Sequence, residues 1–408
     1  MKFDDILRDR SEVVDDHFIV TFEVEGKKRV EDIAWAIALG QSVGNPEVRN
    51  EWETKELFEK HCCKVVNPRP EKFNDIYPQK PFQGFIGKVD IAFPVINTNW
   101  LEDGIAHMIC QIMGGQVDIE YIRKCRAIDI YIPPCVEAVF LKPKYGLSGM
   151  RDYVKSHNVP LFGGIMKPKT GLTPQQMLDM TKQMVDGGVD FIKEDEILSN
   201  PMFCPLEKRV ELIANFRERE NHKFVFAHCI NGDPHVIAKR ALTVADLGGN
   251  GVHINIWSGL GSYNTIRQLD LPLYLHYQKS GDKVITHRDN AFGISWKVLV
   301  KIAALCGVDS IHTGMWGGYL DDDEVELEEV MKILTEANVV PALSCGMHPG
   351  LVEKIRTRFG IDWMANVGGA IHGHPRGTEF GALAMRQAID RKYMQAYGEA
   401  VNKWGIAK

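Results

Sequence analysis

The chain has 408 residues, of which 45% are hydrophobic and 25% are charged, and its formal net charge at pH 7 is −6. These values are ordinary for a globular protein of two domains, or of one barrel with an appended domain. The acidic balance gives no electrostatic reason to expect a nucleic acid or an anionic membrane as partner, and apolar runs such as 297–306 are interrupted by lysine before the length that a membrane span needs.

The cysteines and the first residues bear on where the protein works. Nine cysteines are scattered without a CxxC pair, which is typical of reduced thiols rather than of a disulfide framework. The first twenty residues carry acids and no apolar stretch of the kind found in secretory signals. Together these features predict a cytoplasmic protein with no membrane partner.

Residues 1–135 predict an α+β domain. In chain order the pattern indicates a strand, a helix, a helix that runs into a strand, a pair of strands and a further helix, over 16–25, 29–38, 54–67, 84–96 and 101–113. Because strands and helices do not alternate strictly here, they favour an α+β arrangement. The proline pair at 133–134 marks its end.

From about residue 160 onward, eight short apolar segments alternate with amphipathic stretches. Strands are expected over 161–166, 189–194, 224–229, 252–257, 272–277, 309–314, 340–345 and 364–368. Helices are expected over 174–186, 207–220, 235–247, 294–306, 324–337 and 350–358, and the connection 258–270 has the weakest helical pattern. This alternation predicts a (β/α)₈ barrel domain over residues 136–408. A doubly wound sheet would carry a GxGxxG turn after its first strand, and none is present.

The second barrel strand ends in the strongest motif, Lys193-Glu194-Asp195-Glu196. Active sites of such barrels lie at the carboxyl ends of the strands, and alternation places Lys193 and Asp195 on one face, with Glu196 opening the loop. Two carboxylates suit Mg²⁺. The lysine is either a counter-ion or, after reaction with CO₂, a carbamate that supplies a third oxygen ligand, and the spacing leaves both open.

Cationic and glycine-rich segments follow other strands. Lys167 and Lys169 share a face after strand 1, where they could hold an anionic group or protonate an enolate, or be solvated rim charges. Gly346, Gly368 and Gly369 after strands 7 and 8 suggest phosphate binding by backbone N–H groups. The same glycines would also suit any tight turn.

Five ordered motifs resemble the large subunit of RuBisCO: GGIMKPKTGL (163–172), GGVDFIKEDE (187–196), IHTGM (311–315), ALSCGMHPG (342–350) and NVGGAIHGHPRG (366–377). The resemblance implies an Mg²⁺ site made by carbamylated Lys193 with Asp195 and Glu196, and a homodimer or higher oligomer with active sites at the subunit interface. It implies that Lys167 handles protons on the substrate enediolate, with Lys169 beside it. It also implies phosphate contacts at His312, Ser344, Gly346, Gly368 and Gly369.

The departures from this family are specific. Tyr319 stands where a carboxylase has a lysine on the loop after strand 6, and Gln278-Lys279 replace a His-Arg pair after strand 5. Ala36 and Gly115 replace a glutamate and an asparagine of the N-terminal domain. These changes predict a type IV, RuBisCO-like protein that does not fix carbon.

Three activities known among RuBisCO-like proteins share an enolate formed on Mg²⁺. They are decarboxylation or related C–C cleavage of 3-oxo-isoapionate 4-phosphate, enolisation of 2,3-diketo-5-methylthiopentyl-1-phosphate, and isomerisation of methylthioribulose-1-phosphate. Decarboxylation is favoured because it needs an acid, such as Lys167, and no base. The chain is similar to the enolase subgroup in the motif GMHPG, but that enolase uses a lysine base at the position where this chain has Gly115. Bases remain available in Lys169, His228, His276 or the carbamate, and a non-catalytic regulatory barrel stays an alternative.

Three further residues carry weaker signals. Arg288, in ITHRDN, is a candidate for binding phosphate or carboxylate, or for a structural ion pair. His372 and His374 look like a metal pair, but we interpret them as stabilising the loop after strand 8.

Overall fold

The computed structural model describes residues 3–45, 47–48, 50–71, 84–318 and 322–407. The chain divides into two compact units, one of residues 1–140 with 281–302 and one of residues 141–280 with 303–408. Tyr319, noted above on the loop after strand 6, lies outside the described residues. The domain boundary at residue 135 stays a prediction, and segment 281–302, expected within the barrel region, is part of the first unit.

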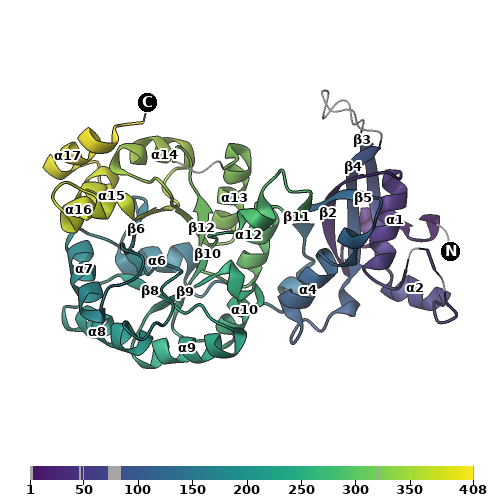
Figure 1. Ribbon diagram of the computed structural model, residues 1–408, viewed down its shortest axis with the longest axis horizontal. Helices are drawn as coiled ribbons and strands as arrows, with labels where there is room; N and C mark the ends of the chain where they lie inside the picture. Colours follow the sequence, from purple (N-terminus) through teal and green to yellow (C-terminus); the bar gives the residue numbers. More distant parts are fainter. Residues whose placement is uncertain (1–2, 46, 49, 72–83, 319–321, 408) are drawn as a thin grey trace. The chain divides into compact units, whose positions relative to one another are not determined.

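The first unit is built on a six-stranded sheet in the order β1-β3-β4-β2-β5-β11, drawn in purple and blue with β11 in green (Figure 1). Its strands are β1 Leu7–Arg8, β2 His17–Gly26, β3 Lys64–Glu71, β4 Phe85–Pro94, β5 Ile122–Tyr131 and β11 Phe292–Ile294. Its helices include α1 Val30–Gly40, α2 Lys55–His61, α4 Gly104–Ile112, α5 Pro134–Glu137 and α11 Lys283–Thr286. The strands β2 and β4 pair in antiparallel register over their whole length, and Phe18 stacks on Phe93 at 4.8 Å between ring centroids.

The second unit is a closed barrel of eight parallel strands in the order β10-β12-β13-β14-β6-β7-β8-β9 (Figure 1). They are β6 Leu161–Ile165, β7 Phe191–Lys193, β8 Val225–Cys229, β9 Gly251–Asn255, β10 Tyr274–Gln278, β12 Ser310–Gly314, β13 Val340–Leu343 and β14 Met364–Val367. Helices of this unit between the strands are α7 Pro174–Asp186, α8 Leu206–Arg219, α9 Pro234–Asp246, α10 Gly261–Gln268, α13 Glu324–Glu336 and α14 Val352–Phe359. The helix before β12, α12 Trp296–Leu305, begins in the first unit and ends in the second. The chain ends in α15 Gly369–His372, α16 Thr378–Ile389 and α17 Gln395–Trp404.

One end of the barrel is closed by α6 Gly146–Val154. Leu147 and Met150 of this helix pack with the strand residues Leu161 and Phe191 in one buried cluster. The buried carboxylate of Asp309, just before β12, accepts hydrogen bonds from the amides at the start of this helix, Tyr145 N at 2.7 Å and Gly146 N at 2.9 Å. These contacts hold α6 against the amino ends of the strands, opposite the carboxyl ends where active sites of such barrels lie.

The predicted fold class, an α+β domain with a (β/α)₈ barrel, is confirmed, and each of the eight predicted barrel strands overlaps an observed one. The strand pair expected over 84–96 is wrong, because β4 runs as one ten-residue strand. Gly87 within it makes no turn, since it continues the ladders to both β2 and β3.

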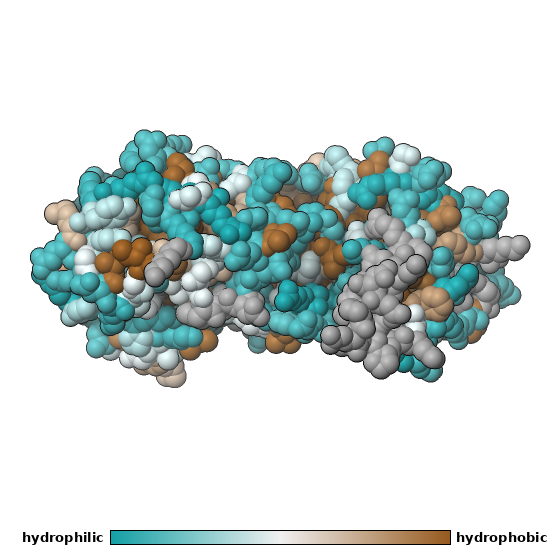
Figure 2. Space-filling model, turned by 90° about the horizontal axis from the view of Figure 1, so that it is seen from above, coloured by the Kyte–Doolittle hydropathy of each residue, from teal (hydrophilic) through white to brown (hydrophobic). Residues whose placement is uncertain are grey.

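The outer surface shows no continuous apolar belt in the view of Figure 2, where hydrophobic residues form small separate patches. Among the described residues, no helix has both the length and the apolar character needed to cross a membrane.

Candidate active site

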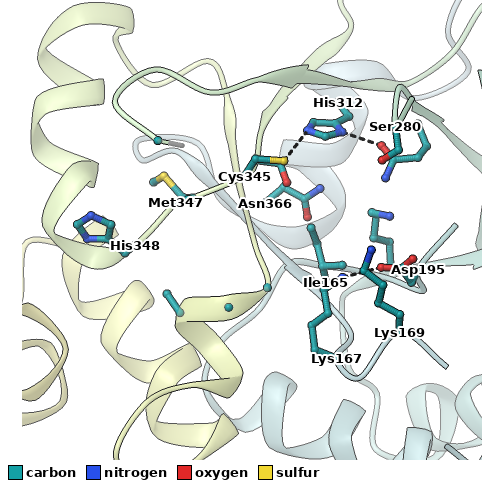
Figure 3. Close-up of a pocket in the computed structure, with 18 of the residues that line it drawn as sticks. Ile165, Lys167, Lys169, Asp195, Ser280, His312, Cys345, Met347, His348 and Asn366 are labelled. Carbon is teal, nitrogen blue, oxygen red and sulfur yellow. Dashed lines mark hydrogen bonds and ion pairs between the residues drawn. The ribbon is translucent and has the colours of Figure 1, made fainter. Parts of the chain in front are cut away.

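A cavity of about 690 Å³ opens at the carboxyl ends of the barrel strands (Figure 3). Volumes of this size suit a small metabolite. Ten of the predicted residues line it: Lys167, Lys169, Lys193, Asp195, Glu196, His312, Ser344, Gly346, Gly368 and Gly369. His228 and His276, named as available bases, are buried and do not line it, and neither does Arg288. Arg288 belongs to the first unit, where its carbonyl accepts a hydrogen bond from Arg126 Nη1 at 2.7 Å.

Several other residues of the cavity wall were not predicted from the sequence, including Ser280, Cys345, Met347, His348, Asn366 and Trp404. Asn366 could have been found, because alternation along the predicted strand 364–368 places it on the same face as Gly368. Trp404 could not, since it comes from α17, a helix that the sequence analysis did not assign.

Four charged groups meet at the end of β7. Lys167 Nζ lies 2.5 Å from Asp195 Oδ2, and Lys193 Nζ lies 3.3 Å from Glu196 Oε2. Gln278 Nε2 donates to the same Glu196 oxygen at 2.8 Å. Burial raises the pKa of Glu196, but the charge of Lys193 and hydrogen bonds from Ser280 and Gln278 outweigh it and hold the pKa well below its ordinary value. Glu196 is therefore a carboxylate near neutral pH.

The side chain of Glu194 points away from the cavity and anchors the end of β7 on the side of the strand that faces away from the cavity. Its carboxylate accepts hydrogen bonds from Arg209 Nε at 2.6 Å, His228 Nδ1 at 3.0 Å and Cys229 N at 2.7 Å. Burial opposes ionisation, yet the charges of Arg209 and His228 lower the pKa of Glu194 to about 2. Since Lys193 and Asp195 flank Glu194, this buried network sets the position of both.

We expect acid to destabilise the protein through these carboxyl groups. The pKa of Glu194 in the folded chain, about 2, is below the ordinary value of 4.5, and that of Glu196 is lowered too. The folded state then binds fewer protons than the unfolded state, so the stabilisation is complete above about pH 4.5 and is lost as the pH falls toward 2. Urea unfolding followed by circular dichroism at a series of pH values measures this. A free energy of unfolding that stays constant across this window would contradict the expectation.

A chain of hydrogen bonds links Glu196 to the opposite wall of the cavity. Gln278 donates to Glu196 through Nε2, so its Oε1 is the acceptor that lies 2.7 Å from His312 Nδ1. The Nε2 atom of His312 lies 3.8 Å from Cys345 Sγ. Burial, together with the charges of Lys279 and Lys193, lowers the pKa of His312 to about 3. The ring is therefore neutral near pH 7.

The loops after β13 and β14 bring backbone close to the cavity. Cys345 and Gly346 both have positive φ, 78° and 101°. A Cβ at Gly368 would lie 3.3 Å from Lys167 Cε, so a side chain there would crowd this lysine. His372 Nε2 lies 2.9 Å from the carbonyl of Ile165, and His374 Nε2 lies 3.1 Å from that of Ala396. Both histidines thus contact backbone carbonyls, and neither lines the cavity.

The described residues contain no group of three or more His, Cys, Asp or Glu side chains that could hold a metal ion. The cavity offers the carboxylates of Asp195 and Glu196, with Lys193 Nζ beside the second. Carbamylation would change the charge of Lys193 from +1 to −1 and add two oxygen atoms. Bound Mg²⁺ would restore the two positive charges removed, so these residues fit Mg²⁺ once Lys193 is carbamylated.

A closed parallel barrel whose ionisable side chains gather at the carboxyl ends of its strands has the arrangement of the barrel enzymes. The family described as ribulose bisphosphate carboxylase large chain, catalytic domain, matches residues 146–339. The ribulose bisphosphate carboxylase of Pyrococcus furiosus is 30% identical over 403 residues, which cover 93% of this chain and 91% of the relative. The 3-oxo-isoapionate-4-phosphate decarboxylase of Rhizobium etli is 29% identical over 389 residues, covering 90% of this chain and 91% of that protein.

Solved structures agree with these relatives. The octameric RuBisCO of Pyrococcus horikoshii superposes with a TM-score of 0.84 at 27% identity, covering 96% of this chain and 94% of the other. The RuBisCO-like protein MtnW of Alicyclobacillus acidocaldarius gives 0.81 at 26% identity, with 96% and 99% covered. The chain belongs to the RuBisCO large-chain family.

Proposed function

We propose that this protein is a RuBisCO-like, Mg²⁺-dependent enzyme that decarboxylates a phosphorylated 3-oxo acid such as 3-oxo-isoapionate 4-phosphate, or cleaves it by a related C–C step. The observation that carries the proposal is the Lys167 ammonium group, held 2.5 Å from Asp195 at the cavity wall. Decarboxylation leaves an enolate that needs one proton, and a positioned lysine can donate it. The similarity to the Rhizobium etli decarboxylase supports the same substrate class.

The remaining residues have complementary parts in this reaction. Ser344, Gly346, Gly368 and Gly369 would hold the phosphate group, as the family resemblance implies. Mg²⁺, held by Asp195, Glu196 and carbamylated Lys193, would supply positive charge against the developing enolate oxygen. When CO₂ leaves, the electrons of the broken C–C bond pass to the carbonyl, and Lys167 donates a proton to the carbon that lost CO₂.

Two features argue against carboxylation of ribulose bisphosphate. Gln278 occupies the position of a histidine, and an amide does not exchange protons near neutral pH. Lys279, in place of an arginine, is 5% exposed, and its Nζ lies 3.8 Å from the carboxylate of Asp322. Its side chain therefore pairs with Asp322 and does not line the cavity.

The direct test is incubation of the full-length protein with Mg²⁺, bicarbonate and 3-oxo-isoapionate 4-phosphate, followed by CO₂ release and product analysis. Mg²⁺-dependent CO₂ release supports the decarboxylase. Cleavage without CO₂ release would favour carboxyl transfer or hydrolysis. If this substrate is untouched, the proposal fails, and 2,3-diketo-5-methylthiopentyl-1-phosphate becomes the next substrate because of the similarity to MtnW. Mg²⁺ binding with no turnover of either would favour a regulatory barrel.

We expect Lys167→Gln to lower kcat by about a hundredfold, the lower end of the usual range for losing a general acid, since Lys169 lines the same cavity. Glutamine can still hydrogen-bond to Asp195, so Mg²⁺ binding measured by calorimetry should persist. Lys182→Gln, on the outer helix α7, is a control without expected effect. An unchanged kcat in Lys167→Gln would remove Lys167 from its role.

We also propose that the protein forms a homodimer or a higher homo-oligomer in the cytoplasm, as expected from the family and from the octameric RuBisCO above. Light scattering coupled to gel filtration measures its mass in solution. A monomer at micromolar concentration would contradict this.

A further inference from the structure

Two asparagines lie just outside the cavity wall, at the carboxyl ends of neighbouring barrel strands. Asn231 follows β8 and is half-buried, and Asn255 is the last residue of β9 and is buried. Neither residue lines the cavity. Because buried amide side chains are normally kept to satisfy other polar groups, the hydrogen bonds of these two asparagines indicate what they hold in place.

Asn231 connects the loop after β7 to the end of β9. Its Nδ2 donates to the carbonyl oxygen of Glu196 at 2.6 Å, and its Oδ1 accepts from Asn255 N at 2.7 Å. The carbonyl of Asn231 accepts in turn from Ser199 Oγ at 2.6 Å and from Arg240 Nη1. Since Asn231 is held through both its backbone and its side chain, it can fix the backbone of Glu196.

Asn255 continues this connection to the loop after β10. Its Nδ2 donates to the carbonyl oxygen of Ser280 at 3.0 Å, and its Oδ1 accepts from Trp257 N at 3.0 Å. Ser280 lines the cavity, on the same side as Asp195 in Figure 3, and its hydroxyl donates to the carboxylate of Glu196. The hydrogen bonds therefore form a closed ring, which starts at the backbone of Glu196 and returns to its side chain.

Glu196 needs such support more than the other two predicted metal ligands. Lys193 is held by the pairing of β7 with β6 and β8, and Asp195 is held by Lys167 Nζ at 2.5 Å. Glu196 lies in the loop beyond the end of β7, where strand pairing does not reach it. A ligand whose backbone and carboxylate are both fixed in advance loses less conformational freedom when it binds an ion.

We propose that Asn231 and Asn255 are positioning residues that hold Glu196 in place as a metal ligand, an inference that rests on the proposed Mg²⁺-dependent function. Asn231 acts on the backbone of Glu196, and Asn255 acts on its carboxylate through Ser280. Neither asparagine contacts the substrate or the ion. Breaking the ring at either residue should therefore weaken Mg²⁺ binding although all three ligands remain.

The first measurement is a calorimetric titration of the full-length protein with Mg²⁺ in the presence of bicarbonate. Asn231→Leu and Asn255→Leu are each expected to weaken binding about tenfold, the lower end of the usual loss when a residue that orients a metal ligand is removed. The double variant should bind about as weakly as the weaker single variant, because one break already opens the ring. Without Mg²⁺, hydrogen exchange of the backbone amides in segment 195–200 should be faster in both single variants.

Asn250→Leu is the matched control at the opposite end of β9. The Asn250 side chain also holds two backbone groups, accepting from Phe226 N at 2.9 Å and donating to the carbonyl of Phe224 at 2.8 Å. Its loss should lower the free energy of unfolding and leave both Mg²⁺ affinity and exchange in segment 195–200 unchanged.

Three results would overturn the proposal: equal weakening of Mg²⁺ binding in Asn250→Leu and Asn255→Leu, unchanged binding in both ring variants, or unchanged exchange in segment 195–200. If the unmodified protein binds no Mg²⁺, the proposed function fails and the metal has no part in this inference. The exchange experiment, which contains no Mg²⁺, still decides whether the two asparagines fix Glu196, so the two failures can be told apart.

Discussion

Arg209→Leu is expected to lower the free energy of unfolding by about 3–5 kcal/mol, the usual cost of breaking a buried ion pair by removing one partner. Arg209 and Glu194 are both fully buried, with Nε and Oε1 2.6 Å apart. Arg209 also donates to the carbonyls of Cys204, at 2.7 Å, and of Ser199. Its loss would leave a buried carboxylate short of a partner and release the loop after β7.

Urea unfolding of Arg209→Leu measures this effect, and Lys208→Ala is the matched control. Lys208 is the neighbouring residue on α8, with an exposed side chain 3.4 Å from Glu211, and such surface pairs contribute at most about 1 kcal/mol. The double variant Glu194→Gln with Arg209→Leu should lose less than the sum of the single changes, because it removes both charges together. Equal stability of Arg209→Leu and Lys208→Ala would show that the network does not hold the end of β7.

The barrel could be predicted from sequence because its strands are short, buried and parallel, so each reads as a local apolar segment between helices. The predicted range 174–186 coincides with α7, which begins with Thr173 as its cap and Pro174 in its first turn. The strand β5 was missed because its residues mix exposed and buried positions, and because its neighbours β2 and β11 come from distant parts of the chain. Pairing at such range leaves no periodic signal in one segment.

The same distinction applies to the site. That Lys193, Asp195 and Glu196 lie together at the cavity could be predicted, because alternation along one strand is a local property. The contacts of Gln278 with Glu196 and with His312 join β10 to the loop after β7 and to β12, and the sequence showed only that an amide replaces a histidine. Likewise, nothing in the motif Lys-Glu-Asp-Glu revealed that Glu194 faces outward to Arg209, a residue of the next helix.

Lys193→Ala is expected to abolish Mg²⁺-dependent turnover, a loss of roughly a thousandfold or more, because a metal that stabilises an enolate contributes several kcal/mol. Lys193 is 1% exposed, and within the described cavity only Asp195 and Glu196 offer carboxylates beside it. Without the carbamate, the Mg²⁺ site would lose one negative charge and the two carbamate oxygen atoms, and only the two acids would remain. The ion should then bind weakly even though both acids remain.

A binding measurement makes this expectation independent of the substrate. Calorimetric titration with Mg²⁺ should show tighter binding in the presence of bicarbonate for the unmodified protein, and no effect of bicarbonate for Lys193→Ala. Lys208→Ala, which changes an exposed lysine, should behave as the unmodified protein. If Mg²⁺ binds equally well with and without bicarbonate, Lys193 acts as a plain counter-ion to Glu196, as their 3.3 Å contact also allows.

If Lys193 is a counter-ion, replacing it with alanine would remove the lysine charge beside Glu196, and the pKa of this acid would rise toward its ordinary value. The two roles of Lys193 therefore predict different responses to bicarbonate, tighter Mg²⁺ binding or none, and one titration separates them.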